Sequence, residues 1–331
     1  MKARKSGDWW TENLSPWSGC KDLALAPEQR ATGCQKCWLP SLLTGPRGRV
    51  IHGELPPWEI VLHPERLAQA LRKRAPQRYG WINGEVADVA TDRPEYLAAC
   101  VGVALARPDH GFGVPTSDPA ALVTWTRWYA TPGPGATPGI WDGHDPMHTW
   151  GIRFGQYHAG VLFAEQVSTV AGTHTEHRRP ALGSHFPPRN WLWLISASTQ
   201  QEVDERMPHA RTLAEMGWRV GLHLEPLLES LDLDKNCMVF NRRAAVRKMV
   251  NGPACLNRDQ AEDTISPVLC SWVASGPPKG HGHTEAELNW HREIRDQARY
   301  AGVPYFYKGE PLDGCANTLP AGWPGSEEVL A

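Results

Sequence analysis

Three cysteines near the N-terminus have the residue type and spacing of a metal centre. Cys34 and Cys37 form a C-x-x-C pair in a segment rich in Pro and Gly, and Cys20 precedes them. Cysteine thiolates hold iron–sulfur clusters, and a centre with three protein ligands keeps one coordination position open. The three residues therefore favour a four-iron cluster with one free iron, as radical chemistry with S-adenosylmethionine (SAM) requires.

Two other interpretations of the cysteines stay open. The first is a structural zinc ion, for which His52 or His63 would supply the fourth ligand. The second is that the thiols are simply free, because a single C-x-x-C pair is a weak signal.

The composition is that of an ordinary globular protein. The chain has 331 residues, of which 41% are hydrophobic and 21% charged, with a net charge of -2. This charge gives no overall attraction to nucleic acid, so any such contact would need a local patch. We expect no signal peptide and no membrane partner, because no apolar run has the required length. Eight cysteines, three of them clustered, indicate reduced thiols or metal ligands and hence a cytoplasmic protein.

Strand and helix patterns alternate along most of the chain. We predict helices at 64–74, 94–106, 201–216, 240–250 and 284–301, and strands at 79–83, 112–114, 122–129, 191–196, 219–224, 268–274 and 303–307. Residues 1–50 are expected to be loop. Alternation of this kind implies parallel pairing, and about six such units fit an α/β fold with a partial or complete β/α (TIM-like) barrel.

The chain is expected to divide into four parts. Residues 1–129 would form the N-terminal part of the barrel with the cysteine loop, and 190–315 its C-terminal part. Between them, 130–189 begins with a Pro/Gly run and is rich in histidine, which is typical of an insertion or lid. Residues 316–331 would form a tail.

Polar residues or glycines follow the predicted strands, at the ends where barrel enzymes carry their catalytic loops. These positions hold Asn83-Gly84-Glu85, Thr116, Ser196, Glu225, Ser275-Gly276 and Lys308.

Four of these residues are candidates for the site. A carboxylate such as Glu225 after an apolar strand is expensive to bury unless it is hydrogen-bonded or paired. We interpret Glu225 and Lys308 as catalytic, and Glu85, Ser196 and Glu225 as cofactor contacts. The alternatives are a structural contact for Glu225 and an ordinary salt bridge for Lys308.

Several short motifs occur in order along the chain. They are Trp17-Ser18-Gly19-Cys20, Gly33-Cys34-Gln35-Lys36-Cys37, His63-Pro64-Glu65-Arg66-Leu67, 190–196 with Asp204-Glu205-Arg206, Leu224-Glu225-Pro226-Leu227-Leu228, Arg295-Asp296-Gln297, Gly302-Val303-Pro304 and Phe306-Tyr307-Lys308. These motifs resemble those of a phage-associated family of radical SAM type. Their shared order along the chain strengthens the cluster interpretation.

The resemblance implies a radical SAM enzyme that holds a [4Fe–4S] cluster through Cys20, Cys34 and Cys37 and uses SAM. Similar phage proteins act in thymidine hypermodification. The implied reaction is isomerisation of an amino-acid adduct on thymidine, from N-linked to C-linked glycinyl. The implied partners are DNA carrying the modified thymidine and an electron donor such as flavodoxin or ferredoxin, in the cytoplasm of the host cell.

The chain departs from the family pattern at two motifs. Val114-Pro115-Thr116-Ser117-Asp118-Pro119 lacks the Lys-Arg pair expected there, and Gly276-Pro277-Pro278-Lys279-Gly280 lacks the expected carboxylate. The carboxylate of an adduct would need a cation, for which Lys308, Lys279 and Arg153 are candidates.

Two other functions stay open. One is a zinc- or cluster-stabilised nucleic-acid-binding module without catalysis. The other is a metal hydrolase centred on His144 and His148 of the insertion.

Overall fold

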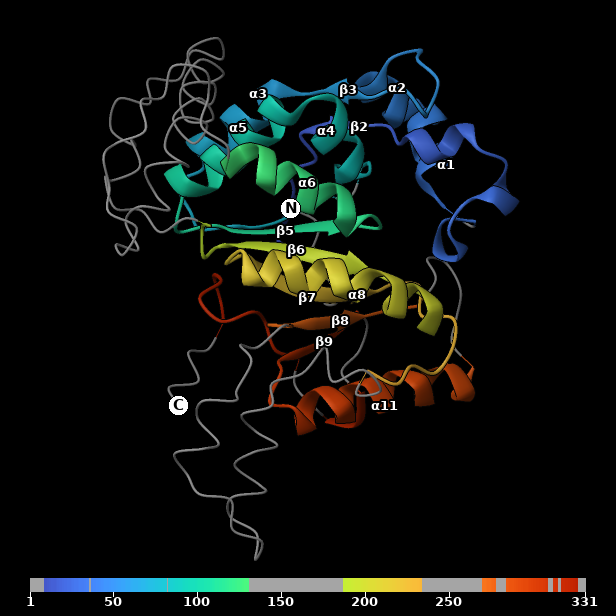
Figure 1. Ribbon diagram of the computed structural model, residues 1–331. Coiled ribbons are helices and arrows are strands. Elements are labelled where there is room, and N and C mark those ends of the chain that lie inside the picture. Colours follow the sequence, from blue (N-terminus) through green and yellow to red (C-terminus); the bar gives the residue numbers. More distant parts are fainter. Residues whose placement is uncertain are drawn as a thin grey trace, which may run out of the picture.

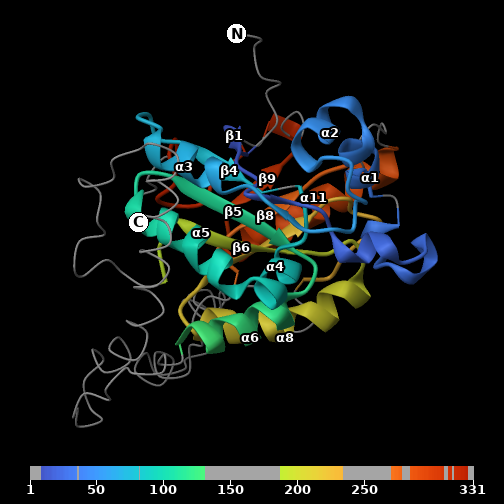
Figure 2. The same cartoon turned by 90° about the horizontal axis from the view of Figure 1, so that it is seen from above.

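A curled, all-parallel sheet organises the protein. The computed structural model describes residues 9–35, 37–81, 83–130, 187–233, 270–277, 284–308, 312–314 and 317–326. Within them, seven strands pair in the order β1 (Glu12–Asn13), β4 (Arg78–Gly80), β5 (Gly111–Thr116), β6 (Trp191–Ser196), β7 (Arg219–Leu224), β8 (Val273–Ser275) and β9 (Tyr305–Tyr307). Each pairing is parallel. The sheet curls into a half-barrel, which confirms the α/β fold and is compatible with the expected partial TIM-like barrel (Figures 1 and 2).

Helices cover the outer face of this sheet. They are α3 (Pro64–Arg72), α4 (Val86–Asp92), α5 (Pro94–Ala106), α6 (Pro119–Ala130), α8 (Gln200–Glu215) and α11 (Glu285–Tyr300). In Figure 1, α8 lies along β6 and β7, and α11 lies beyond β9. None of the described helices has both the length and the apolar composition needed to cross a membrane.

Two smaller groups of elements precede α3. An antiparallel pair joins β2 (Trp17–Ser18) to β3 (Val61–Leu62). The short helices α1 (Leu39–Thr44) and α2 (Pro46–His52) follow the cysteine loop. The expectation that residues 1–50 are all loop is therefore wrong, because the segment also supplies β1 to the main sheet.

The apolar strand β6 is buried on both faces, as expected for a central parallel strand. Trp191, Trp193 and Ile195 pack in the large core that includes the helices. The alternating residues Leu192 and Leu194 pack in a second cluster on the inner face of the half-barrel.

Tryptophans fill the inner face near the N-terminal ends of the strands. Trp9, Trp272 and Trp323 belong to this second cluster. A Cβ at Gly113 would lie 2.4 Å from the Trp9 ring, so β5 needs glycine there. Trp272 Nε1 donates to Thr318 O at 2.8 Å. Part of the segment 316–331 thus packs inside the half-barrel.

The expected strand at 122–129 is wrong, because this segment lies in α6. Its aromatic and β-branched residues suggested a strand. The Asp118 carboxylate, however, accepts from the Ala121 N–H at 3.1 Å and starts a helix. Leu122, Trp125 and Tyr129 are then buried with helical spacing.

Most of the other expected helices that can be checked are present in the structure. The helices expected at 64–74, 94–106, 201–216 and 284–301 and the strand at 191–196 are confirmed, with ends shifted by at most a few residues. Helix α4 and strand β1 were not predicted. The expected helix at 240–250 and almost all of the expected insertion lie outside the described residues.

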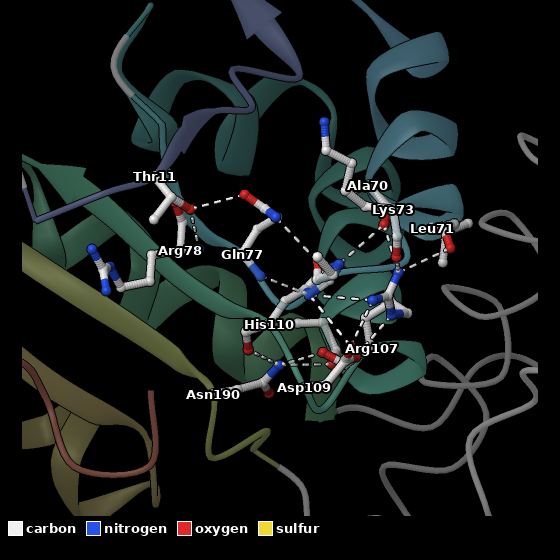
Figure 3. A network of polar contacts seen from close by, with 12 residues as sticks. Thr11, Ala70, Leu71, Lys73, Gln77, Arg78, Arg107, Asp109, His110 and Asn190 are labelled. Atoms are coloured by element: carbon white, nitrogen blue, oxygen red, sulfur yellow. Dashed lines mark hydrogen bonds and ion pairs between the residues drawn. The ribbon is translucent and has the colours of Figure 1, made fainter. Parts of the chain in front are cut away.

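A buried arginine closes the N-terminal end of the sheet (Figure 3). Arg107 Nη1 donates to Ala70 O and Leu71 O at 3.0 and 3.1 Å and also to Lys73 O, at the end of α3. The other guanidinium nitrogens donate to both carboxylate oxygens of Asp109. Arg107 thereby satisfies helix carbonyls that lack partners within the helix.

His110 in the same network is held neutral. Its Nδ1 accepts from the Gln77 N–H at 3.2 Å, so the proton lies on Nε2, 3.3 Å from Ala70 O. Burial first and the neighbouring Arg107 charge second lower the pKa of His110 to about 4. A proton on Nδ1 would point at the Gln77 amide and the guanidinium.

We expect His110 to make the protein less stable as the pH falls from 6.5 toward 4. The unfolded histidine binds a proton in this range and the folded one does not, so stability increases with pH. The effect can reach about 3 kcal/mol, because one pKa unit corresponds to about 1.36 kcal/mol. Urea unfolding of the wild type and His110→Asn at several pH values measures it.

The comparison with the variant isolates His110 from other groups. The pKa of His63 is also lowered to about 4, whereas burial raises the pKa of Asp88 to about 6, with the opposite pH dependence. His110→Asn should flatten the pH dependence, and the exposed control His209→Asn should leave it unchanged. Equal slopes in the wild type and His110→Asn would contradict the prediction.

Candidate functional site

The cysteine loop lies at the C-terminal end of the sheet. In Figure 1, α1 and the turns before it lie at the end to which the β5 and β6 arrows point. Cys34 ends a short 3-10 turn, Thr32–Cys34. A Cβ at Gly33 would lie 2.3 Å from Ser198 Oγ and 3.9 Å from Pro226 Cδ. The turn that carries Cys34 therefore rests on the residues that follow β6 and β7.

A buried serine fixes the strand before Cys20. Ser18 Oγ lies 2.9 Å from His52 Nδ1 and 2.8 Å from His63 Nε2. His52 Nε2 is also 2.9 Å from Pro56 O. Gly19 has φ +100, and a Cβ there would lie 1.8 Å from Glu59 O, so only glycine fits beside Cys20. Both histidines are thus used in positioning the loop, and the structure gives no support to either as a zinc ligand.

The described cysteines fall into two groups. Cys20, Cys34 and Cys37 are partly exposed, whereas Cys100 and Cys270 are fully buried, and none of the five forms a disulfide. Burial is the main cause that raises the thiol pKa values, to about 12 for Cys34. Without a metal the three thiols are therefore protonated at neutral pH, and binding a metal would release their protons.

Three free, accessible thiols on one loop have the donor chemistry of a cluster site. Cys20 and Cys37 pack against the same small apolar cluster, and the Cys37 N–H donates to Cys34 O at 3.1 Å. Among the described residues, however, no three Cys, His, Asp or Glu side chains converge closely enough to hold a metal ion. The three thiols are the right kind of ligand for an iron–sulfur cluster, but in this structure their side chains do not converge on one point.

An ion-paired group occupies the inner face at the same end of the sheet. Lys308 Nζ lies 2.5 Å from Glu225 Oε1, and His223 Nε2 lies 3.3 Å from Glu225 Oε2. Burial alone would raise the pKa of Glu225, but His223 and Lys308 outweigh it and lower the pKa to about 2. Lys308 Nζ also lies 4.7 Å from the centroid of the Trp10 ring.

Close packing brings this group together. A Cβ at Gly276 would lie 2.9 Å from Lys308 Cβ and 3.5 Å from Glu225 Cδ. The structure therefore shows that Glu225 and Lys308, which are far apart in the sequence, meet at the C-terminal ends of β7 and β9, on either side of β8. Their predicted catalytic roles stay predictions.

Glu85 has a structural explanation at its position. One carboxylate oxygen accepts from the Ala87 N–H and from Thr116 Oγ1, at 3.1 and 2.6 Å. The other accepts from the N–H and the hydroxyl of Ser117, at 2.9 and 2.8 Å. These bonds attach the start of α4 to the end of β5 and occupy most of the hydrogen-bond acceptor sites of the carboxylate. They leave little for the predicted cofactor contact.

Ser196 ends β6 on the inner face, beside His223 in the sheet register. Its carbonyl accepts from Arg206 Nη1 at 2.6 Å. We call Ser196, His223, Glu225 and Lys308 the mouth of the half-barrel. His223 was not predicted, although residues two apart on a strand share a face, and this spacing could have linked it to Glu225.

A surface hollow of about 770 Å³ lies elsewhere, between the start of α8 and α11. Its lining includes Gln200, Asp232, Glu293 and Tyr300, and it contains no residue of the mouth and no cysteine. It therefore does not extend the candidate site.

Comparison with known proteins identifies a family. The family model "Protein of unknown function (DUF5131)" matches residues 5–311. No curated protein and no solved structure matches the chain. Because the family model covers most of the chain, the protein belongs to the DUF5131 family.

Proposed function

We propose that the protein is a radical SAM enzyme whose Cys20, Cys34 and Cys37 bind a [4Fe–4S] cluster. The observation that carries the proposal is the position of the Cys34 turn, which rests on the ends of β6 and β7 beside the mouth. Parallel barrels carry their catalytic groups at this end. The motif resemblance adds support that comes from the sequence alone.

In this proposal each part of the chain has a separate task. Cys20, Cys34 and Cys37 would hold the cluster, which with SAM would supply the radical chemistry for hydrogen abstraction from the substrate. Lys308, held by Glu225, presents an ammonium group at the mouth, where it can orient an anionic group of the substrate. The tryptophans of the inner face exclude water from the N-terminal side.

For the substrate we propose DNA that carries an aminoacylated thymidine. The bond from the thymine methylene carbon to the glycine nitrogen would be replaced by a bond to the glycine α-carbon, and the hydrogen lost from the α-carbon would be balanced by one gained at the nitrogen. Substrate and product therefore have the same mass, and the isomerisation needs no net oxidant. The support for this substrate is the motif resemblance. Of the candidate cations for the adduct carboxylate, Lys308 is at the mouth, whereas Lys279 and Arg153 lie outside the described residues.

Free thiols and an oxygen-sensitive cluster require a reducing compartment. The proposal therefore places the protein in the cytoplasm of the host cell. It also requires an electron donor such as flavodoxin or ferredoxin.

Anaerobic reconstitution with iron and sulfide tests the proposal. We expect a brown protein that absorbs near 400 nm and that forms 5′-deoxyadenosine from SAM in the presence of a reductant. With duplex DNA bearing an aminoacylated thymine, nucleoside digestion should show a product of unchanged mass and altered retention.

Other outcomes separate the parts of the proposal. A colourless protein with stoichiometric zinc would contradict the enzyme and favour the nucleic-acid-binding module. Formation of 5′-deoxyadenosine without any change in a DNA nucleoside would reject the substrate and keep the radical chemistry.

A further inference from the structure

His223 is the one member of the mouth with a buried polar atom that has no partner among the described residues. Its side chain is 13% exposed. Its Nδ1 is buried and makes no hydrogen bond there. The residue lies on β7 between Ser196 of β6 and Ala274 of β8. Val220, Leu222 and Leu224 of the same strand belong to the helix-side core, so the alternating His223 belongs to the inner face.

The contact with Glu225 determines which ring nitrogen carries the proton. The carboxylate of Glu225 is paired with the ammonium of Lys308 and is therefore ionised, so it can only accept hydrogen bonds. Nε2 of His223, 3.3 Å from Glu225 Oε2, must therefore carry a hydrogen. In the neutral imidazole Nδ1 is then an acceptor with a free lone pair.

Comparison with the buried His110 shows that His223 lacks a partner for one ring nitrogen. Both of its ring nitrogens have partners, since Nδ1 accepts from the Gln77 N–H and Nε2 faces Ala70 O. A buried polar atom without a partner is unfavourable and calls for a ligand or another group. At His223 the carboxylate partner is present and the donor to Nδ1 is missing.

The neighbouring charges indicate what kind of donor fits. Both oxygens of Glu225 are already used, one by Lys308 and one by His223. An incoming ammonium group would have to share these oxygens with Lys308 and His223, and it would be repelled by the ammonium of Lys308. A neutral hydroxyl or N–H group meets neither obstacle.

We propose that His223 Nδ1 is a ligand-binding acceptor of the mouth, oriented by Glu225, and that it accepts a hydrogen bond from a neutral O–H or N–H group of the bound nucleoside. That the ligand is a nucleoside rests on the proposed function. The tautomer of His223 and its orientation by Glu225 do not.

Nitrogen NMR on protein with ¹⁵N-labelled histidine tests the proposal at pH 8, where an ordinary imidazole is neutral. The His223 signals are assigned by their loss in His223→Gln. We expect Nε2 protonated and Nδ1 unprotonated in the free protein. Glu225→Gln should weaken this preference. Thymidine, a neutral nucleoside with two hydroxyl groups and one N–H, should shift the Nδ1 signal in the direction of hydrogen-bond acceptance.

Two substitutions distinguish the ring nitrogens. His223→Gln places an amide near the position of Nε2 and can keep the donor to Glu225, but it removes Nδ1. His223→Asn places its amide oxygen near Nδ1 and keeps an acceptor there. We expect thymidine to bind about tenfold more weakly to His223→Gln, and His223→Asn to recover part of this loss. His209→Gln, at an exposed histidine, is the matched control and should bind as the wild type does.

Three results would overturn the inference. They are a protonated Nδ1 in the free protein at pH 8, a tautomer preference that Glu225→Gln leaves unchanged, and an Nδ1 signal that thymidine does not move. The test is independent of the cluster. A protein without iron that shows the expected tautomer and shift keeps this inference while the proposed function fails.

Discussion

Replacing Cys34 with serine is expected to remove iron and sulfide together and to reduce formation of 5′-deoxyadenosine to background. A serine hydroxyl keeps about the size of the side chain but is a much poorer ligand than the Cys thiolate that normally holds an iron–sulfur cluster. Changes to groups that only support a metal ligand lower metal affinity or activity about 10- to 100-fold. Loss of a ligand itself should therefore exceed about 100-fold. Iron and sulfide analysis, absorbance near 400 nm and product assay measure the effect.

The chain offers matched controls for this experiment. Cys100 and Cys270 are fully buried and pack away from the cysteine loop. Cys100→Ala and Cys270→Ala should lower stability, because each leaves a small cavity, and should keep the full cluster. Cys34→Ser with undiminished iron and sulfide would contradict the assignment. So would Cys270→Ala if it lost the cluster to the same extent.

The central strands could be predicted from the sequence because burial on both faces leaves a plain pattern. The segment from Trp191 to Ile195 is a continuous apolar run, and it forms β6. Strand β1 has only two residues, and its position depends on pairing with Tyr79 and Gly80, far away in the sequence. No local pattern contains that information. In α6 the local pattern was misleading, since strand-forming residues there follow a helix start at Asp118.

The candidate site could be predicted in part for a similar reason. The ends of parallel strands lie at one edge of a sheet, so Glu225 and Lys308 could be placed near each other from the strand pattern alone. The same rule also selected Glu85, which instead bonds to Thr116 and Ser117. The position of a residue at a strand end does not reveal whether its side chain is already engaged in hydrogen bonds to nearby structural elements.

The surroundings of the cysteines were beyond prediction. Spacing indicates that Cys20, Cys34 and Cys37 share a loop, but not where the loop rests. That depends on packing between distant segments, such as Gly33 against Ser198. The histidines that were candidates for zinc have another use for the same reason, since His52 at the end of α2 and His63 after β3 both contact Ser18.

The largest expected effect on stability is that of Arg107→Met. Methionine keeps much of the apolar length of the side chain and removes every donor. Two carbonyls of α3, the carbonyl of Lys73 just after it and the Asp109 carboxylate lose their partner at once. Breaking a buried charged network by removing one member costs about 3–5 kcal/mol. We expect a loss of this size in the free energy of unfolding, measured by urea denaturation at pH 8.

Arg93→Met is the matched control for this prediction. Arg93 is exposed, and its Nη1 donates to the carbonyl of the preceding Asp92 at 3.2 Å. Its replacement should change stability by no more than about 0.5 kcal/mol, as is usual for surface substitutions. If Arg107→Met were no more harmful than Arg93→Met, the network would not stabilise the fold. Because Arg107 lies at the opposite end of the sheet from the cysteines, folded Arg107→Met should still take up its full complement of iron. Loss of stability without loss of iron would show that the Arg107 network stabilises the fold without affecting the proposed cluster site at the other end of the sheet.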